Sequence, residues 1–70
     1  MDKIFITAKI INIFKEEQYP TVEEKVAYIT ALGDIGNKES FEEIIRVYEK
    51  SKKDSTIRIA TILSIAKFCK

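Results

Sequence analysis

The spacing of apolar residues between positions 41 and 50 restricts the fold more than any other feature of the chain. In FEEIIRVYEK the apolar residues fall at offsets 0, 3, 4, 6 and 7, which gathers them on one side of a helix with 3.6 residues per turn. The many β-branched residues elsewhere follow the same helical spacing and do not alternate strictly, so no segment qualifies as a strand. The sequence therefore predicts an all-α protein.

Helix-start motifs divide the chain into segments. SFEE at residues 40–43 and TVEE at residues 21–24 each have the form of a capping box, and Pro20 marks a break before the second of these. Asp54 or Ser55 is the expected cap of a last helix. We expect helices over about residues 2–17, 21–36 and 55–68, together with one that begins within residues 37–40 and ends at Lys50.

Both glycines of the chain, Gly33 and Gly36, lie in the short stretch ALGDIG. Gly33 is small enough to let another helix approach closely, and Gly36 can adopt the positive φ of a helix C-cap. The polar connections between the expected helices are short, as is usual between antiparallel neighbours. The sequence therefore predicts that the second helix ends at Gly36 and packs closely at Gly33.

The chain contains an internal repeat. A shift of 33 residues places the second helix over the fourth, and a shift of 34 residues places the first over the third. In the first of these alignments Lys25 falls on Arg58, Val26 on Ile59, Ala27 on Ala60, Ile29 on Ile62, Leu32 on Ile65, Gly33 on Ala66 and Ile35 on Phe68. We expect a single domain, residues 1–70, made of two antiparallel helical hairpins, with repeat one at about 2–36 and repeat two at about 37–70.

Two stretches, residues 25–45 and 54–68, resemble the HEAT-like repeat family in its short, phycobilisome-lyase-type form. The first carries Ala-Leu-Gly-Asp-Ile-Gly followed by Asn-Lys-Glu, as such repeats commonly do. The second matches the family at Asp54, Ile57, Arg58, Ala60, Ile65 and Phe68. The resemblance covers about residues 21–68 and implies four helices stacked as a short α-α superhelix. A tetratricopeptide-like hairpin is the alternative fold, but its characteristic tryptophan, tyrosine and late proline are missing.

The residue types offer no catalytic, metal or cofactor site. The chain has no histidine, so the His-Glu pairs of the metal-dependent hydroxylases within the resembling family have no counterpart here. The carboxylate pairs at residues 16–17, 23–24 and 42–43 are helix neighbours about 100° apart, which is typical of solvated faces. Cys69 is the only cysteine and has no histidine base. We expect no enzyme, no cofactor and no small-molecule substrate.

The same counts bear on the compartment and on charged partners. A single cysteine allows no intrachain disulfide and favours the reducing cytoplasm, and no stretch approaches the roughly 18 apolar residues of a membrane span. The net charge of +1 gives no strong field toward nucleic acid or anionic lipid. A phosphate-binding surface is the alternative function that we keep, and it would use Lys52, Lys53, Arg58 and Lys67.

The outermost helices carry the main functional indication, because both are apolar around nearly their whole circumference. A compact four-helix bundle would bury more of these faces than a stacked solenoid would. Alternatively, the faces pack against a second copy in a homodimer, or against further repeats or a different protein. We expect a non-catalytic module for protein–protein interaction or self-association. Its interface residues would be Ile4, Phe5, Ile59, Ile62 and Phe68.

Overall fold

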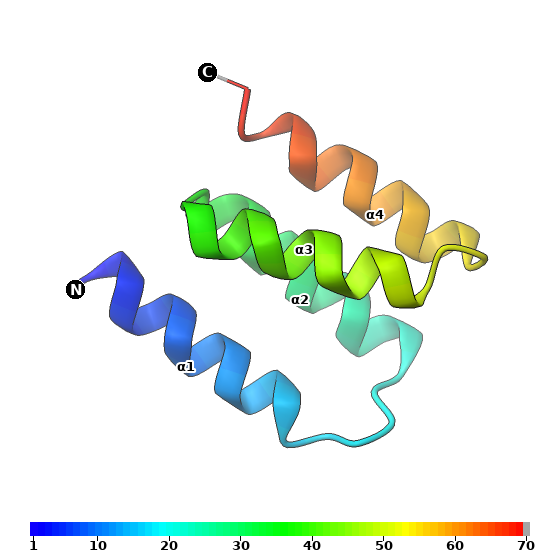
Figure 1. Ribbon diagram of the computed structural model, residues 1–70, viewed down its shortest axis with the longest axis horizontal. Coiled ribbons are helices and arrows are strands. Elements are labelled where there is room, and N and C mark those ends of the chain that lie inside the picture. Colours follow the sequence, from blue (N-terminus) through cyan, green and yellow to red (C-terminus); the bar gives the residue numbers. More distant parts are fainter. Residues whose placement is uncertain (70) are drawn as a thin grey trace.

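The computed structural model describes residues 1–69, which form four α-helices and no strand (Figure 1). The helices are α1 (Lys3–Lys15), α2 (Val22–Ile35), α3 (Lys38–Lys50) and α4 (Ser55–Ala66). Consecutive helices run in opposite directions (Figure 1). The predicted fold class is confirmed: the protein is all-α and consists of two antiparallel helical hairpins that stack on each other. The first and last helices are shorter than expected, since α1 ends at Lys15 and α4 at Ala66.

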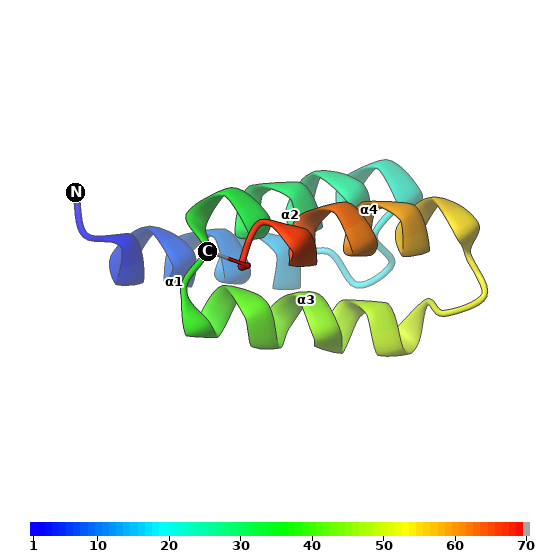
Figure 2. The same cartoon turned by 90° about the horizontal axis from the view of Figure 1, so that it is seen from above.

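The helices form a thin stack with α2 at its centre. Helix α2 packs most closely against α4 and also contacts α3, whereas α1 chiefly contacts α2. Figures 1 and 2 show α1 at one edge of the stack and α4 at the other, with α2 and α3 between them. The principal extents are 34 × 30 × 16 Å. Both edge helices therefore have one side without a neighbouring helix of the same chain.

The buried apolar core comes from three of the four helices. Its members are Tyr28, Ile29, Leu32, Ile44, Val47, Ile57 and Ala60. Helix α1 contributes no fully buried apolar side chain and only packs Ile10, Ile11 and Phe14 against the edge of this core. Its one buried residue is Thr7. The core is consequently small, as expected for a chain of this length.

The helix ends follow the local signals at most positions. Thr21 and Glu24 form a reciprocal capping box, with the Glu24 N–H donating to Thr21 Oγ1 at 3.1 Å and the Thr21 N–H donating to Glu24 Oε1 at 2.9 Å. Gly36 has a φ of 73° and its N–H donates to the Leu32 carbonyl, so the predicted C-cap is confirmed. Asp54 caps α4 by accepting from the Thr56 and Ile57 N–H groups.

The expected capping box at Ser40 and Glu43 is wrong. Helix α3 begins at Lys38, and its cap is Asn37, whose Oδ1 accepts from the Ser40 N–H at 2.8 Å. Ser40 therefore lies inside the first turn, where it is fully buried and its Oγ has no hydrogen-bond partner among the described residues. The helix starts earlier because Asn37 provides the cap and also bonds to α1.

The predicted close packing at Gly33 is confirmed. A Cβ atom built at Gly33 would lie 2.8 Å from Ser64 Cβ and 3.2 Å from Ser64 Cα. Real Cβ atoms do not approach other carbon atoms so closely, so a larger residue at position 33 would push α4 away from α2. The small residues at this crossing explain why α2 and α4 pack more closely than any other pair.

Candidate functional site

The outer side of α4 is an apolar surface that no other helix of the described chain covers. Ile59, Ile62 and Leu63 are 59, 65 and 64% exposed, and Ala66 is also exposed. The spacing of these four residues, i, i+3, i+4 and i+7, puts them in one line along the helix. We call this line the outer stripe of α4.

The outer stripe exists because α4 is apolar on two sides and only one of them has a neighbour. The inner side buries Ile57, Ala60, Thr61 and Ser64 against the rest of the stack. The polar group of Thr61 is satisfied within the helix, since its hydroxyl donates to the Ile57 carbonyl at 2.8 Å. Sequence periodicity predicts both apolar sides equally well, and the packing decides which of them stays exposed.

Shallow hollows flank the outer stripe on both sides. The hollow between α3 and α4 has a volume of about 450 Å³, and Tyr48 and Ile62 are among its lining residues. The hollow between α2 and α4 has a volume of about 510 Å³, and Val26 and Leu63 lie on its opposite walls. The stripe is therefore a ridge with room for side chains of another helix on either side.

The first helix exposes apolar side chains at the other edge of the stack. Ile4 and Phe5 are 63 and 61% exposed, and they belong to the beginning of α1, which extends past the ends of the other helices (Figure 2). Further along α1, Ile13 is also exposed and borders a hollow of about 290 Å³ between α1 and α2. The structure thus separates the predicted α1 residues from those on α4, and they do not form one surface.

The predicted interface residue Phe68 lies in a different environment. Its ring is partly buried, packs against the core and meets the ring of Phe41 edge to face at a centroid distance of 5.3 Å. Most of this side chain therefore serves contacts within the chain, and its role at an interface stays a prediction. Conversely, Leu63 and Ile13 are exposed apolar residues that sequence reasoning did not select. The all-round apolar pattern contained both of them but gave no sign of which side would be covered.

The four cations of the alternative phosphate-binding surface do not gather in one place. Lys52 and Lys53 line a shallow hollow at the turn between α3 and α4, and Lys52 Nζ lies 3.3 Å from Glu49. Lys67 lies beyond the other end of α4 and pairs with Asp34 at 2.6 Å. It follows Arg58 by nine residues, which corresponds to about 13 Å along a helix.

Basic side chains do collect at the end of the stack where α1 and α3 finish. Lys15, Lys25, Arg46 and Lys50 line a hollow of about 490 Å³, whose one acidic lining residue is Glu17. Lys25 Nζ donates to Ser51 Oγ at 3.1 Å. Lysines near helix C-termini also interact favourably with the carbonyl groups there, which accounts for Lys15 and Lys50 without any ligand.

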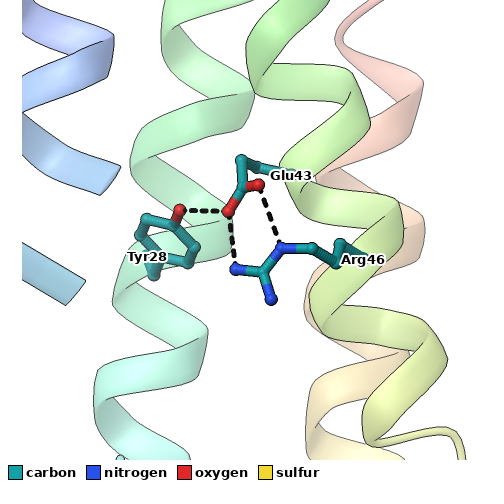
Figure 3. Close-up of polar contacts among 3 residues, drawn as sticks. All are labelled: Tyr28, Glu43 and Arg46. Carbon is teal, nitrogen blue, oxygen red and sulfur yellow. Dashed lines mark hydrogen bonds and ion pairs between the residues drawn. The ribbon is translucent and has the colours of Figure 1, made fainter. Parts of the chain in front are cut away.

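A polar cluster of Tyr28, Glu43 and Arg46 joins α2 to α3 (Figure 3). The Tyr28 hydroxyl donates to Glu43 Oε1 at 2.7 Å, and Arg46 donates from Nε to Oε2 at 3.0 Å and from Nη2 to Oε1 at 2.8 Å. The Arg46 hydrogen bonds hold the pKa of Glu43 below its usual value, whereas burial above all raises the pKa of Tyr28. Both shifts move the pKa values further from neutral pH, so neither group exchanges a proton there. The cluster therefore suits a structural role.

This cluster corrects the expectation that the carboxylates of Glu42 and Glu43 both lie on a solvated face. Glu42 is exposed, but the Glu43 side chain is only 15% exposed and is fully engaged by its two partners. The ring of Phe14 from α1 stacks on Tyr28, with centroids 3.8 Å apart and planes within 1° of parallel. The cluster therefore lies where three helices meet.

The described residues offer few other features of functional interest. Within residues 1–69 no group of three or more His, Cys, Asp or Glu residues is placed to hold a metal ion, and Cys69 is an exposed free thiol. Over the same residues no helix is long and apolar enough to cross a membrane. Comparisons with protein-family models, with curated proteins and with solved structures gave no significant match. The outer stripe of α4 is thus the candidate site that the geometry favours most.

Proposed function

We propose that the chain is a non-catalytic helical-repeat module of the HEAT-like type, which binds a protein helix along the outer stripe of α4. The support comes from comparing equivalent positions of the two repeats. Ile29 and Ile62 are equivalent under the shift of 33 residues, yet Ile29 is fully buried and Ile62 is 65% exposed. The position that α2 buries inside the stack is therefore exposed on α4, at the edge of the stack.

The other three residues of the outer stripe also have equivalents in α2 that border α4, and one of these, Thr30, is itself exposed. Their equivalents in α2 are Val26, Thr30 and Gly33, and all three lie on the side of α2 that faces α4. In α2 this side receives a neighbouring helix. We infer that the equivalent side of α4 receives one as well, in this case from a partner.

The energetics favour such an occupant. Fully burying a large aliphatic side chain contributes roughly 1.5–3 kcal/mol of favourable free energy. The three large side chains of the stripe are about 60% exposed, so burying the exposed part of each against a partner would contribute roughly 1–2 kcal/mol. Contiguous apolar surface of this kind on a small protein marks interaction sites. Part of that gain offsets the lost freedom of the two molecules, so the affinity depends on how well the partner fills the flanking hollows.

The proposal is tested by placing a photo-crosslinking phenylalanine analogue at position 62. We expect a protein adduct of defined mass on irradiation, either with the purified chain or in a cell extract. The matched control carries the analogue at Glu42, an exposed position on α3, and should give no such adduct. Equal adducts at both positions, or none at position 62, would contradict the proposal.

Binding of nucleic acid through phosphate contacts is the second candidate function. It is favoured by two neighbouring basic hollows at the end of the stack. One is lined by Lys15 and the other by Lys53, and Lys25 and Lys50 line both. This function predicts that affinity for a labelled oligonucleotide falls steeply with added salt and that Lys50→Gln reduces the slope. Unchanged mobility of the oligonucleotide at low salt would exclude it.

A further inference from the structure

We propose that the partner of the outer stripe is a second copy of this chain, docked head to tail. The stripe of one copy would seat on the side of α2 that faces away from α4, next to the hollow between α1 and α2 of the following copy. This inference rests on the proposed function and names its partner. It follows from the repeat, because each chain carries both halves of the same helix–helix contact.

The receiving half lies on α2. Ala27 is exposed, Ala31 is half-buried, and both line the hollow of about 290 Å³ with Ile13 and Phe14 of α1. Under the shift of 33 residues these alanines are equivalent to Ala60 and Ser64. Ala60 and Ser64 are the residues with which α4 approaches α2 within one chain. The exposed side of α2 therefore matches the side of α4 that is already in use.

The known contacts between α2 and α4 can be transferred to the junction between two copies. The contact between Gly33 and Ser64 becomes a contact between Ala66 and Ala31 of the next copy. Both remain small residues, which suits a close crossing. The ion pair between Asp34 and Lys67 becomes an ion pair between Lys67 and Asp34 of the next copy. Both side chains keep about half of their surface exposed, so each can face a second partner.

Charge complementarity favours this pairing over a symmetric one. Helix α2 carries three carboxylates and only one lysine, whereas the charged groups of α4 and its C-cap are Arg58 and Lys67. An antiparallel contact between two α4 helices, centred on Ile62, would bring Arg58 of one copy near Lys67 of the other. Like charges at such distances oppose association, whereas α4 against α2 joins opposite charges.

The arrangement has a consequence for the assembly. Helix α4 lies at one edge of the stack (Figure 1), and the receiving side of α2 borders α1, which lies at the other edge. A contact between two different surfaces leaves one of each unused in every dimer, so further copies can add. The expected product is an open stack in which two-hairpin units continue the same helical repeat.

Sedimentation velocity with two complementary variants tests this inference. Ile62→Asp spoils the outer stripe and leaves the receiving side intact, whereas Ala27→Arg does the reverse. We expect the wild type to gain mass with concentration beyond a dimer, each variant alone to stay monomeric, and an equimolar mixture to stop at a dimer. Glu42→Arg is the matched control and should behave as the wild type. All samples are kept reduced, because Cys69 is an exposed thiol.

A disulfide experiment provides an independent measurement. On a Cys69→Ser background, Ala31→Cys with Ala66→Cys should give a ladder of linked chains under mild oxidation, and Ala66→Cys alone should not. The two positions cannot bond within one chain. Position 31 lies about 200° around α2 from Gly33, the residue that faces α4.

Each other outcome overturns the inference in a distinguishable way. A monomeric wild type without a ladder overturns it, while a foreign protein crosslinked at position 62 would still support the proposed function. A dimer that survives Ala27→Arg but not Ile62→Asp indicates a symmetric contact of α4, which again leaves the proposed function standing. Association that Ile62→Asp does not change overturns both.

Discussion

Asn37 donates a hydrogen bond from Nδ2 to Thr7 Oγ1 at 3.0 Å and thereby links the start of α3 to the one buried residue of α1. The same side chain accepts from the Ser40 N–H through Oδ1. The Thr7 hydroxyl in turn donates to the Lys3 carbonyl at 2.6 Å. This hydroxyl therefore both donates and accepts a hydrogen bond. Since α1 adds no fully buried apolar side chain to the core, this polar link matters for how α1 attaches.

Asn37→Ala should destabilise the protein by about 1–2 kcal/mol, because it removes the cap of α3 together with the link to α1. Thr7→Val removes the link and the hydrogen bond from Thr7 to the Lys3 carbonyl, and it leaves the cap of α3 intact. The double variant Asn37→Ala/Thr7→Val, measured with both single variants by urea unfolding, should reveal a coupling of roughly 0.5–1.5 kcal/mol. Strictly additive effects would mean that the two side chains do not interact.

Ser40→Ala should leave stability unchanged or raise it by up to about 1 kcal/mol. The Ser40 hydroxyl is buried and has no partner among the described residues, so its removal relieves an unsatisfied polar group. Alanine also has the higher helix propensity at this position inside the first turn. Thermal unfolding of the variant measures the effect. A clear loss of stability would restore Ser40 as the cap of α3.

Gly33→Ala should destabilise the protein by roughly 1–2 kcal/mol, although alanine is the better helix former. The added methyl group would lie 2.8 Å from Ser64 Cβ, so α4 must move. Ser64→Gly removes the nearest contacted atom, Ser64 Cβ, together with Oγ, and leaves only Cα at 3.2 Å. The variant with both changes should therefore be more stable than Gly33→Ala alone in urea unfolding. Failure of this rescue would indicate that the crossing is looser than described.

The Tyr28–Glu43 pair should make stability depend on pH at both extremes. The pKa of Glu43 is lowered from 4.5, so its contribution is present above that pH and is lost as the pH falls toward the folded value. The pKa of Tyr28 is raised from 10.0, so its contribution is present below pH 10.0 and is lost as the pH rises further.

Difference measurements isolate these effects from the titration of other groups. Glu43→Gln should reduce the acid dependence, and Tyr28→Phe should reduce the alkaline dependence and cost about 1.5 kcal/mol at neutral pH. Urea unfolding of the wild type and both variants from acid to alkaline pH gives the differences. A wild-type and Tyr28→Phe difference that stays constant above pH 10.0 would contradict the assigned hydrogen bond.

Local signals in the sequence were sufficient wherever neighbours along the chain decide the structure. The capping box at Thr21, the left-handed stop at Gly36 and the helical spacing of α3 each involve atoms within one or two turns, so the residue pattern contains the whole interaction. At the start of α3 two competent caps, Asn37 and Ser40, lie three residues apart. The contact with Thr7, thirty residues away, favours the first, and no local pattern records it.

The sequence by itself thus determined the helices, their approximate ends, the doubling of the hairpin and the close crossing at Gly33. Only the tertiary structure decided that Glu43 is held by Tyr28 and Arg46, that Phe68 turns inward, and that Ile59, Ile62 and Leu63 stay exposed. The reason is physical: periodicity states how apolar a helix is around its axis, but burial depends on which neighbours the other helices place beside it. For a helix that is apolar on both sides, this second question has no local answer.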